Sequence, residues 1–267
     1  MYNRILAIVF ALAVAAIPVS YTNVVEARIV TDGLVSLWTF DESSIEEKTA
    51  KDAWGDNHGT IIGEPKSVNG MIEEALDFDG VVDYVDCGND ISLSFGSNDF
   101  TVSLWFKIAA FIDSHASLIG KTRGGWAAPD VLGWEFALRS GGYYINIDNI
   151  ANDAKGTIPL KSFSLGTFYY ATFVVDRQNG EVRVYTDGEY LSKLNIGAVK
   201  GTLDNNYPLH IGWRIWGGFL NGLIDEVKIY SKALSEDEIQ QNYDTTSQFG
   251  TAVEPANKLA ATWGKIK

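Results

Sequence analysis

The stretch F-T-V-S-L-W-F-K-I at residues 100–108 indicates the fold class of this chain. Its large apolar residues alternate along the chain and fall on one face: Phe100, Val102, Leu104, Phe106 and Ile108. Alternation with a period of two is typical of a strand that buries one side. The stretch therefore predicts a half-buried β-strand.

The same alternation recurs in Y-Y-A-T-F-V-V at 169–175 and in E-V-R-V-Y-T at 181–186. Turn signals separate such strands, as in D-R-Q-N-G at 176–180 and D-G at 79–80. Many short strands with Gly and Asp turns are typical of a sandwich or a barrel. Residues 30–244 contain no fixed repeat or linker, so we expect one domain.

A single segment near the end of the chain has the signature of a helix start, L-S-E-D-E-I at 234–239. Ser235 can cap the helix together with Glu238, and Leu234 can pack against Ile239. We expect a short structural helix that ends near Tyr243. The residues beyond it, 245–267, read as a loosely ordered tail, with a docking strand or sorting signal as the alternative.

The first 27 residues have a basic start at Arg4, an apolar run and then Pro18. This order is typical of a secretory signal peptide, which we expect to be cleaved after Ala27. An uncleaved membrane anchor is the alternative, although the apolar run is short for a bilayer span. We therefore expect a protein that is secreted, periplasmic or on the cell surface.

The composition narrows the possible partners. The net charge is −13, and the predicted signal segment carries one charge of each sign, so the mature chain keeps that value. Nucleic acid and anionic membranes are therefore unlikely partners. Cys87 is the only cysteine, so no internal disulfide can form, and its alternation with Asp86 places it on a buried face.

Six stretches, taken in order, resemble the laminin-G-like jelly-roll modules of bacterial exported proteins, within the concanavalin A-like lectin/glucanase superfamily. They are G-L-V-S-L-W-T-F-D-E from 33, D-A-W-G-D-N-H-G-T from 52, A-L-D-F-D-G-V-V-D-Y-V from 75, F-T-V-S-L-W-F-K from 100, G-E-V-R-V-Y-T-D-G-E from 180 and L-I-D-E-V-K-I-Y-S-K-A-L-S-E-D-E-I from 223. The chain departs from the family where W-x-H is frequent, because it has Phe168-Tyr169-Tyr170 instead.

The resemblance implies an all-β fold, a two-sheet antiparallel jelly-roll sandwich with one short C-terminal helix. The laminin-G-like domain would span residues 28–244 and the tail 245–267. The resemblance also implies a binding role, and often a calcium ion. We expect a monomer.

Two aspartates lie in phase with core residues. The period-two pattern places Asp225 on the same face as Leu223 and Val227, and Asp41 ends the first strand. A buried charge needs a partner, and the two acids would lie close together if the first and last strands pair. Asp52, Asp56 and Asn57 on the following loop offer further oxygen ligands of the kind that calcium prefers.

The resemblance assigns a structural calcium to Asp41, Asn57 and Asp225, which match the family's motif positions. The alternative is that Asp41 and Asp225 cap backbone amides or meet basic side chains. His58 is more readily explained as a turn residue that hydrogen-bonds locally than as a ligand.

Four of the eight tryptophans lie beside glycines: Trp126, Trp134, Trp213 and Trp216. We predict an exposed recognition patch because Trp and Arg are favoured at binding hot spots. Its residues would be Trp126, Trp216, Arg123 and Arg214. The alternative is that these rings close the rim of the core.

Catalysis is not supported by the sequence. Glycoside hydrolases need two carboxylates facing a groove, and the chain has no E-x-D-x-E strand. Its acidic runs, such as Glu73-Glu74, lie outside alternating strands, and the three histidines lack zinc-ligand spacing. We therefore expect a non-catalytic module that binds carbohydrate, with protein interaction or adhesion as the alternative and a glycoside hydrolase as the least supported possibility.

Overall fold

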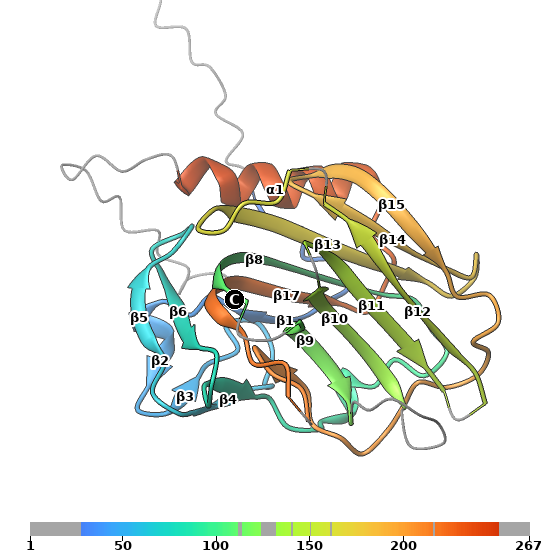
Figure 1. The fold of residues 1–267 in the computed structure, drawn as a ribbon, viewed down its shortest axis with the longest axis horizontal. Helices are drawn as coiled ribbons and strands as arrows, with labels where there is room; N and C mark the ends of the chain where they lie inside the picture. Colours follow the sequence, from blue (N-terminus) through green and yellow to red (C-terminus); the bar gives the residue numbers. More distant parts are fainter. Residues whose placement is uncertain are drawn as a thin grey trace, which may run out of the picture.

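The computed structural model describes residues 28–111, 114–123, 132–139, 141–149, 151–160, 162–215 and 217–250, with only the backbone given for 248–250. Within these ranges the chain forms two antiparallel sheets that face one another, with a helix at the C-terminal end (Figure 1). This arrangement confirms the predicted jelly-roll sandwich. The predicted signal segment, Trp126 and Trp216 lie outside the described residues.

The first sheet has eight strands in the order β15-β14-β13-β8-β17-β6-β5, and β1 also pairs with β17. Its strands are β1 (Leu34–Trp38), β5 (Lys66–Asn69), β6 (Glu74–Asp79), β8 (Phe100–Ala110), β13 (Phe168–Asp176), β14 (Glu181–Thr186), β15 (Glu189–Asn195) and β17 (Asn221–Tyr230). The long strands β8 and β17 pair at its centre. The first and last strands of the domain therefore lie side by side, as predicted.

The second sheet has nine strands in the order β12-β11-β10-β9-β16-β7-β4-β3-β2. They are β2 (Ile45–Glu46), β3 (Thr49–Ala50), β4 (Gly59–Ile62), β7 (Tyr84–Asp86), β9 (Ala116–Thr122), β10 (Gly133–Arg139), β11 (Gly142–Asp148), β12 (Asp153–Pro159) and β16 (His210–Ile211). Two short 3-10 helices, Glu42–Ser44 and Ile91–Leu93, join strands of this region.

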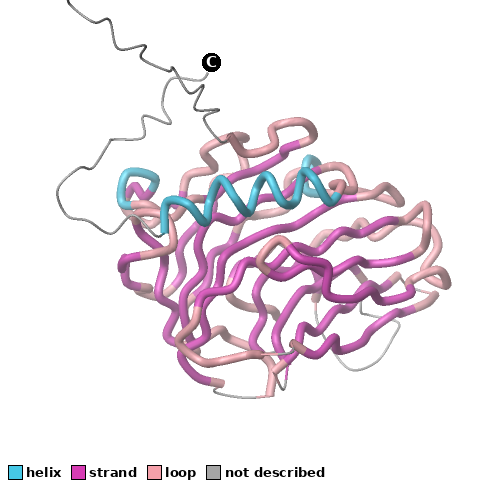
Figure 2. Tube along the Cα trace, turned by 90° about the horizontal axis from the view of Figure 1, so that it is seen from above, coloured by secondary structure: helices cyan, strands magenta, loops and turns pink. Residues whose placement is uncertain are grey.

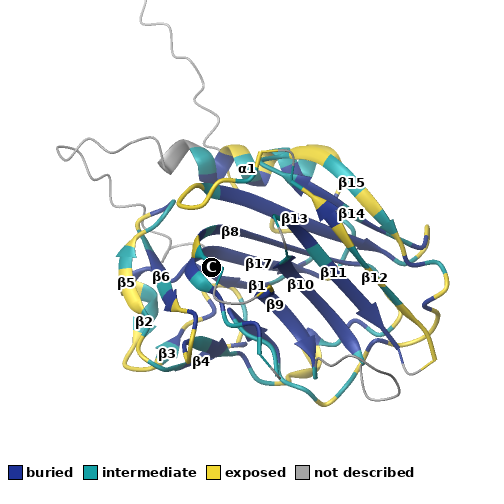
Figure 3. Ribbon diagram, in the orientation of Figure 1, coloured by how far each residue is buried: buried dark blue, intermediate teal, exposed yellow. Residues whose placement is uncertain are grey.

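The hydrophobic core lies between the sheets. The alternating residues of β8 point into it and are completely buried. Core side chains of the two sheets meet there. The ring of Phe173, in β13, stacks on the ring of Phe136, in β10, with centroids 4.4 Å apart. Cys87 is buried in the same core, as its alternation predicted. Buried residues follow the central strands, whereas edge strands such as β5 and β15 are mostly exposed (Figure 3).

Helix α1 (Glu236–Gly250) begins as the sequence predicted. The Ser235 amide donates to Glu238 at 2.9 Å, the Glu238 amide donates to the Ser235 hydroxyl at 3.3 Å, and Leu234 and Ile239 share one apolar cluster. The helix does not end near Tyr243 as expected. It continues to Gly250, because its second half also packs on the sheet.

The helix lies across the outer face of the eight-stranded sheet (Figure 2). Trp105, which points away from the core, donates its indole N–H to the Thr246 hydroxyl at 3.0 Å. The Tyr243 ring lies 5.8 Å from Trp105 and 6.0 Å from Tyr170. The helix therefore occupies this face. No helix among the described residues is long and apolar enough to cross a membrane.

Replacing Phe173 by alanine should lower the free energy of unfolding by about 3–5 kcal/mol, because a buried aromatic ring leaves a cavity when it is removed. Phe173 also makes an edge contact with Tyr143, with centroids 5.2 Å apart. Ile91, with an exposed fraction of 82%, provides the control, and Ile91→Ala should change stability by less than about 0.5 kcal/mol. Urea unfolding of both variants tests this. Equal effects would contradict the assignment of the core.

Candidate functional site

Two features of the molecule are candidates for function. One is an acidic cluster beside the paired first and last strands. The other is a cavity on the outer face of the nine-stranded sheet.

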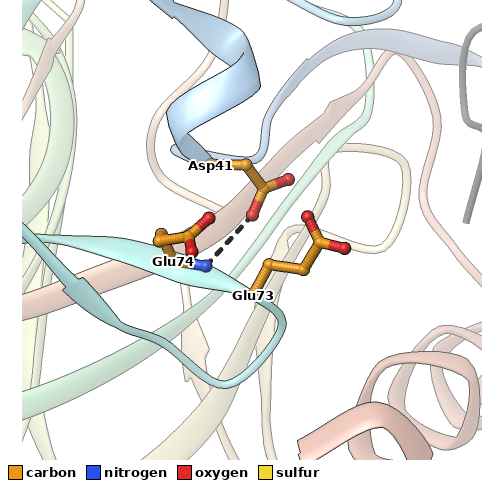
Figure 4. Close-up of side chains that lie close together, drawn as sticks. All are labelled: Asp41, Glu73 and Glu74. Atoms are coloured by element: carbon orange, nitrogen blue, oxygen red, sulfur yellow. Dashed lines mark hydrogen bonds between the residues drawn. The ribbon is translucent and has the colours of Figure 1, made fainter. Parts of the chain in front are cut away.

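The acidic cluster begins with Asp41, which follows β1 at the start of the first 3-10 helix. Turn residues Glu73 and Glu74 approach it from the start of β6, and Figure 4 shows the three side chains together. One carboxylate oxygen from each lies within 4.8 Å of the others. The Glu74 backbone N–H donates to Asp41 Oδ1 at 3.2 Å. Carboxylates at such spacing are suited to a hard divalent cation.

Asp225 fixes the turn that carries these glutamates. It is completely buried in β17, and its Oδ2 accepts the backbone N–H groups of Met71 at 2.7 Å and Ile72 at 3.0 Å. Gly70 lies so close that a Cβ there would be 2.6 Å from the same oxygen. Asp225 Oδ1 is buried and has no hydrogen-bond partner among the described residues. The predicted capping alternative therefore accounts for only one of the two carboxylate oxygens.

The electrostatics of the cluster are unfavourable without a cation. Burial is the main cause that raises the pKa of Asp225 well above its usual range, and the charges of Glu226 and Asp41 add to it. Burial also raises the pKa of Asp41 to about 7, and Glu226 and Glu73 add to that rise. Lys228 is fully buried and forms an ion pair of 2.6 Å with Glu226. Lys228 thus directly compensates the charge of Glu226, the acid next to Asp225.

The backbone around the cluster is strained. Phe40, Glu73 and Glu226 have φ angles of 58°, 48° and 53°, in the left-handed region that residues with a Cβ avoid. Such conformations often occur at functional sites, where the surrounding structure enforces them. Here each lies beside or within the acidic cluster. The strained backbone therefore lies where the carboxylates come close together.

Asn57, the third predicted calcium ligand, is held by a different network. Its side-chain amide donates to the hydroxyls of Ser36 at 2.8 Å and Ser92 at 2.9 Å. Asp52 organises the loop through the backbone N–H groups of several residues, that of Asn57 among them. His58 accepts the Asp52 backbone N–H at 3.0 Å, which confirms its local role. Calcium ligation by Asn57 stays a prediction. The geometry instead adds Glu73 and Glu74, which the sequence showed only as an acidic run.

The second candidate is a cavity of about 360 Å³. Arg214, predicted as a recognition residue, lines it, whereas Arg123 directly follows β9 and is half-buried. Side chains on β10, β11 and β12 that alternate with core residues form most of its wall, so the cavity opens on the outer face of the sheet. The lining residues are His115, Arg139, Tyr144, Lys155, Gly156, Thr157 and Arg214.

Tyr144 lies at the centre of this wall. The Arg139 guanidinium is 5.3 Å from the centre of its ring, and the His115 ring meets it edge-on at 5.1 Å. Glu135, completely buried, accepts from His115 Nε2 at 2.8 Å and from Arg214 Nη1 at 3.4 Å. Burial opposes ionisation of Glu135, but His115 and then Arg214 outweigh it and hold the pKa below its usual range. Glu135 therefore anchors two of the cavity's basic side chains.

An aromatic cluster lies farther along the sheet, beyond β9. The Trp213 ring stacks on Phe219 at 5.4 Å and lies 4.5 Å from Tyr84. Trp213, Phe219 and Tyr84 are all half-buried. Trp134, by contrast, is buried in the core, as the rim-packing alternative proposed. Trp213 is thus half-buried on the outer face of this sheet and lies next to the cavity residue Arg214 in sequence.

The comparisons agree with this architecture. The Laminin_G_3 family model, described as the concanavalin A-like lectin/glucanases superfamily, matches residues 79–240, more than half of the chain. The chain therefore belongs to this superfamily. A comparison with curated proteins finds no match.

Several solved structures share the fold. The binding domain of Paraclostridial Mosquitocidal Protein 1 is 21% identical with a TM-score of 0.63, and the receptor binding domain of botulinum neurotoxin C/D mosaic serotype is 16% identical with 0.62. In both cases the match covers 80% of this chain and 52% of the other. Trypanosoma rangeli sialidase in complex with sialic acid is 17% identical with a TM-score of 0.64, over 84% of this chain and 35% of the enzyme. This chain thus spans only about half or a third of these proteins.

The raised pKa of Asp41 predicts a pH dependence of stability in metal-free protein. Its carboxyl has an ordinary pKa of 3.8 and a folded pKa of about 7, so the folded state binds more protons between these values. The contribution of Asp41 to stability therefore falls as pH rises from about 4 to 7. With chelator present, wild type should lose more stability over this range than Asp41→Asn. Parallel pH profiles in urea unfolding would contradict the pKa shift.

Proposed function

We propose that this protein is an exported, non-catalytic module that binds carbohydrate with the outer face of its nine-stranded sheet and is stabilised by one calcium ion at the acidic cluster. The observation that carries the binding role is the cavity lined by His115, Arg139, Tyr144, Lys155 and Arg214. Export follows from the signal-like segment at residues 1–27.

Carbohydrate suits this face for two reasons. A volume of about 360 Å³ lies in the usual range of small-molecule sites, and the wall offers several hydrogen-bond donors and hydroxyls. The rings of Tyr84, Trp213 and Phe219 give the same sheet an aromatic surface, on which the apolar side of a sugar ring can stack. Asn146, on the same face, has a buried amide oxygen with no partner among the described residues.

The arrangement of acids favours binding over hydrolysis. A glycoside hydrolase needs two carboxylates beside the scissile bond. Among the described residues that line the cavity there is no carboxylate. Glu135 lies buried behind the wall and is engaged by His115 and Arg214.

The calcium proposal rests on geometry. Asp41, Glu73 and Glu74 converge from two separate segments, and Asp225 supplies a buried oxygen that lacks a partner among the described residues. A bound cation would favour the ionised form of Asp41, whose pKa is raised mainly by burial and further by the charges of Glu226 and Glu73. Because the cluster joins β1, β6 and β17, the ion would act on stability and not on the ligand directly.

Protein recognition is the second candidate, favoured by one observation. The turn between β6 and β7 exposes Val81 and Val82, with exposed fractions of 60% and 51%. Exposed apolar side chains at a turn can insert into a protein partner. The two structurally similar toxin fragments are binding domains as well.

Calcium should raise the melting temperature of the wild-type protein by about 5–10 °C at roughly one hundred times its dissociation constant, because it binds only the folded state. Asp225→Ala and Asp41→Asn should abolish this rise. The milder Asp41→Asn variant covers the case in which Asp225→Ala does not fold. Glu46→Gln removes an exposed acid outside the cluster and should respond like wild type. No calcium response in wild type would overturn the metal assignment.

A glycan array followed by calorimetry tests the binding role. Trp213→Ala should weaken the best glycan at least about fivefold, as expected when a ring at a binding hot spot is removed. Trp54→Ala is the matched control, because Trp54 is 46% exposed but belongs to the loop near Asp52. If Trp54→Ala weakened binding as much as Trp213→Ala, the proposed face would be wrong. Binding to protein receptors but to no glycan would favour the second candidate.

A further inference from the structure

The cavity on the nine-stranded sheet has an unusual charge for this chain. The sequence has 34 acidic and 21 basic residues, yet the described side chains that line the cavity include three fixed cations and a histidine, with no carboxylate among them. These cations come from three separate places: Arg139 from β10, Lys155 from β12 and Arg214 from the segment after β16. Their convergence is a product of the fold, and it concentrates positive charge on one part of a chain whose net charge is −13.

The basic groups surround a single aromatic ring. Arg139 packs over the Tyr144 ring, and His115 meets its edge. Burial is the main cause that raises the pKa of the Tyr144 phenol, the charge of Glu135 adds to the rise, and Lys155, Arg214 and Arg139 act in the opposite direction. All three cations therefore lie near this hydroxyl. A ligand that enters the cavity meets the phenol and the cations together.

The nearby acids are placed behind or beside the wall. Glu135 is completely buried and holds His115 and Arg214 in position. Asp153 pairs with Lys155 at 2.5 Å where both are about half exposed, a geometry that water screens strongly. Arg214 Nε is buried and has no hydrogen-bond partner among the described residues, which is costly for a charged donor. That atom lies behind the wall, and it is the guanidinium and ammonium groups lining the cavity, those of Arg139, Lys155 and Arg214, that an anionic ligand would contact.

We propose that this cavity binds the carboxylate of an acidic sugar, such as a uronic or sialic acid, through Arg139, Lys155 and Arg214. This inference rests on the proposed carbohydrate-binding function and specifies its ligand class. A guanidinium can bind a planar carboxylate with two parallel hydrogen bonds. The volume of about 360 Å³ suits a small ligand, while Glu135, Asp153 and Asp148 offset part of the positive charge around it.

Paired ligands that differ mainly in the acid test the proposal. Sialyllactose is compared with its uncharged carboxyl methyl ester, and tetragalacturonate with its methyl ester, by calorimetry of the full protein at low and high salt. At least one acidic ligand should bind at least tenfold more tightly than its neutral partner, and raised salt should reduce this preference. Which acidic ligand shows the preference distinguishes sialic acid from uronic acid.

Variants of the cavity identify the residues responsible. Arg139→Gln and Lys155→Gln should each reduce the preference for the acid at least fivefold, while affinity for the neutral partner changes less than twofold. Lys51→Gln, which removes an exposed cation near β3, should leave the preference unchanged. Arg139 and Lys155 serve better than Arg214, because loss of Arg214 would leave the buried Glu135 without one of its partners.

The outcomes separate this inference from the function on which it rests. Equal affinity for acidic and neutral sugars would overturn the carboxylate assignment and leave carbohydrate binding intact. A preference for lactose sulfate over both carboxylated ligands would also overturn it. Binding to none of these ligands or to any array glycan would overturn both proposals.

Discussion

The carboxylate of Asp225 is the constraint around which one end of the sandwich is organised. β17 pairs with β8, β6 and β1, so any charge in its middle is removed from water. One oxygen of Asp225 is satisfied by the backbone of the turn after β5, which places Glu73 and Glu74 against Asp41. An ionised group in such a place costs free energy unless it is paired. A cation at the cluster would resolve that cost and would link the two ends of the domain.

The two outer faces of the sandwich differ in their side chains and in what covers them. On the eight-stranded sheet, Trp105, Tyr170 and Tyr230 point outward and are covered by helix α1. On the nine-stranded sheet, the equivalent outward positions carry Glu135, Tyr144 and Lys155, which are polar and form the cavity or its support. The aromatic residues of the first face serve packing, whereas Tyr144 is surrounded by basic groups. The fold thus leaves the outer face of the nine-stranded sheet open for the proposed binding role.

Calcium and ligand would act at separate places in this design. The acidic cluster lies beside β1, β6 and β17, while the cavity is built on β10–β12 with Arg214. The cluster belongs to one sheet and the cavity to the other. An ion that stabilises the pairing of the terminal strands can therefore hold the sandwich together without touching the ligand. The strained residues Phe40, Glu73 and Glu226 all belong to the first of these sites.

The strands, their core-facing residues and the helix start could be predicted from local sequence patterns. Period-two alternation in β8 and the Ser235–Glu238 pair are local patterns, and local hydrophobic and capping preferences act without knowledge of the partner strands. The sequence also predicted Asp41 and Asp225 as metal ligands, because each was placed in phase with core residues, and Arg214 as a recognition residue. The structure puts Arg214 in the wall of the cavity, and its role in binding stays a prediction.

Which distant groups meet could not be predicted in this way, because it depends on how the strands are arranged in space. Glu73 and Glu74 join Asp41 because the β5–β6 turn is tied to a carboxylate more than 150 positions away in sequence. Arg139, Lys155 and Arg214 likewise share a cavity only through the strand order of the second sheet. The extension of α1 to Gly250 depends on Trp105 and Thr246 meeting across the sheet. Such contacts arise from chain topology, and residue spacing along one strand or helix carries no record of them.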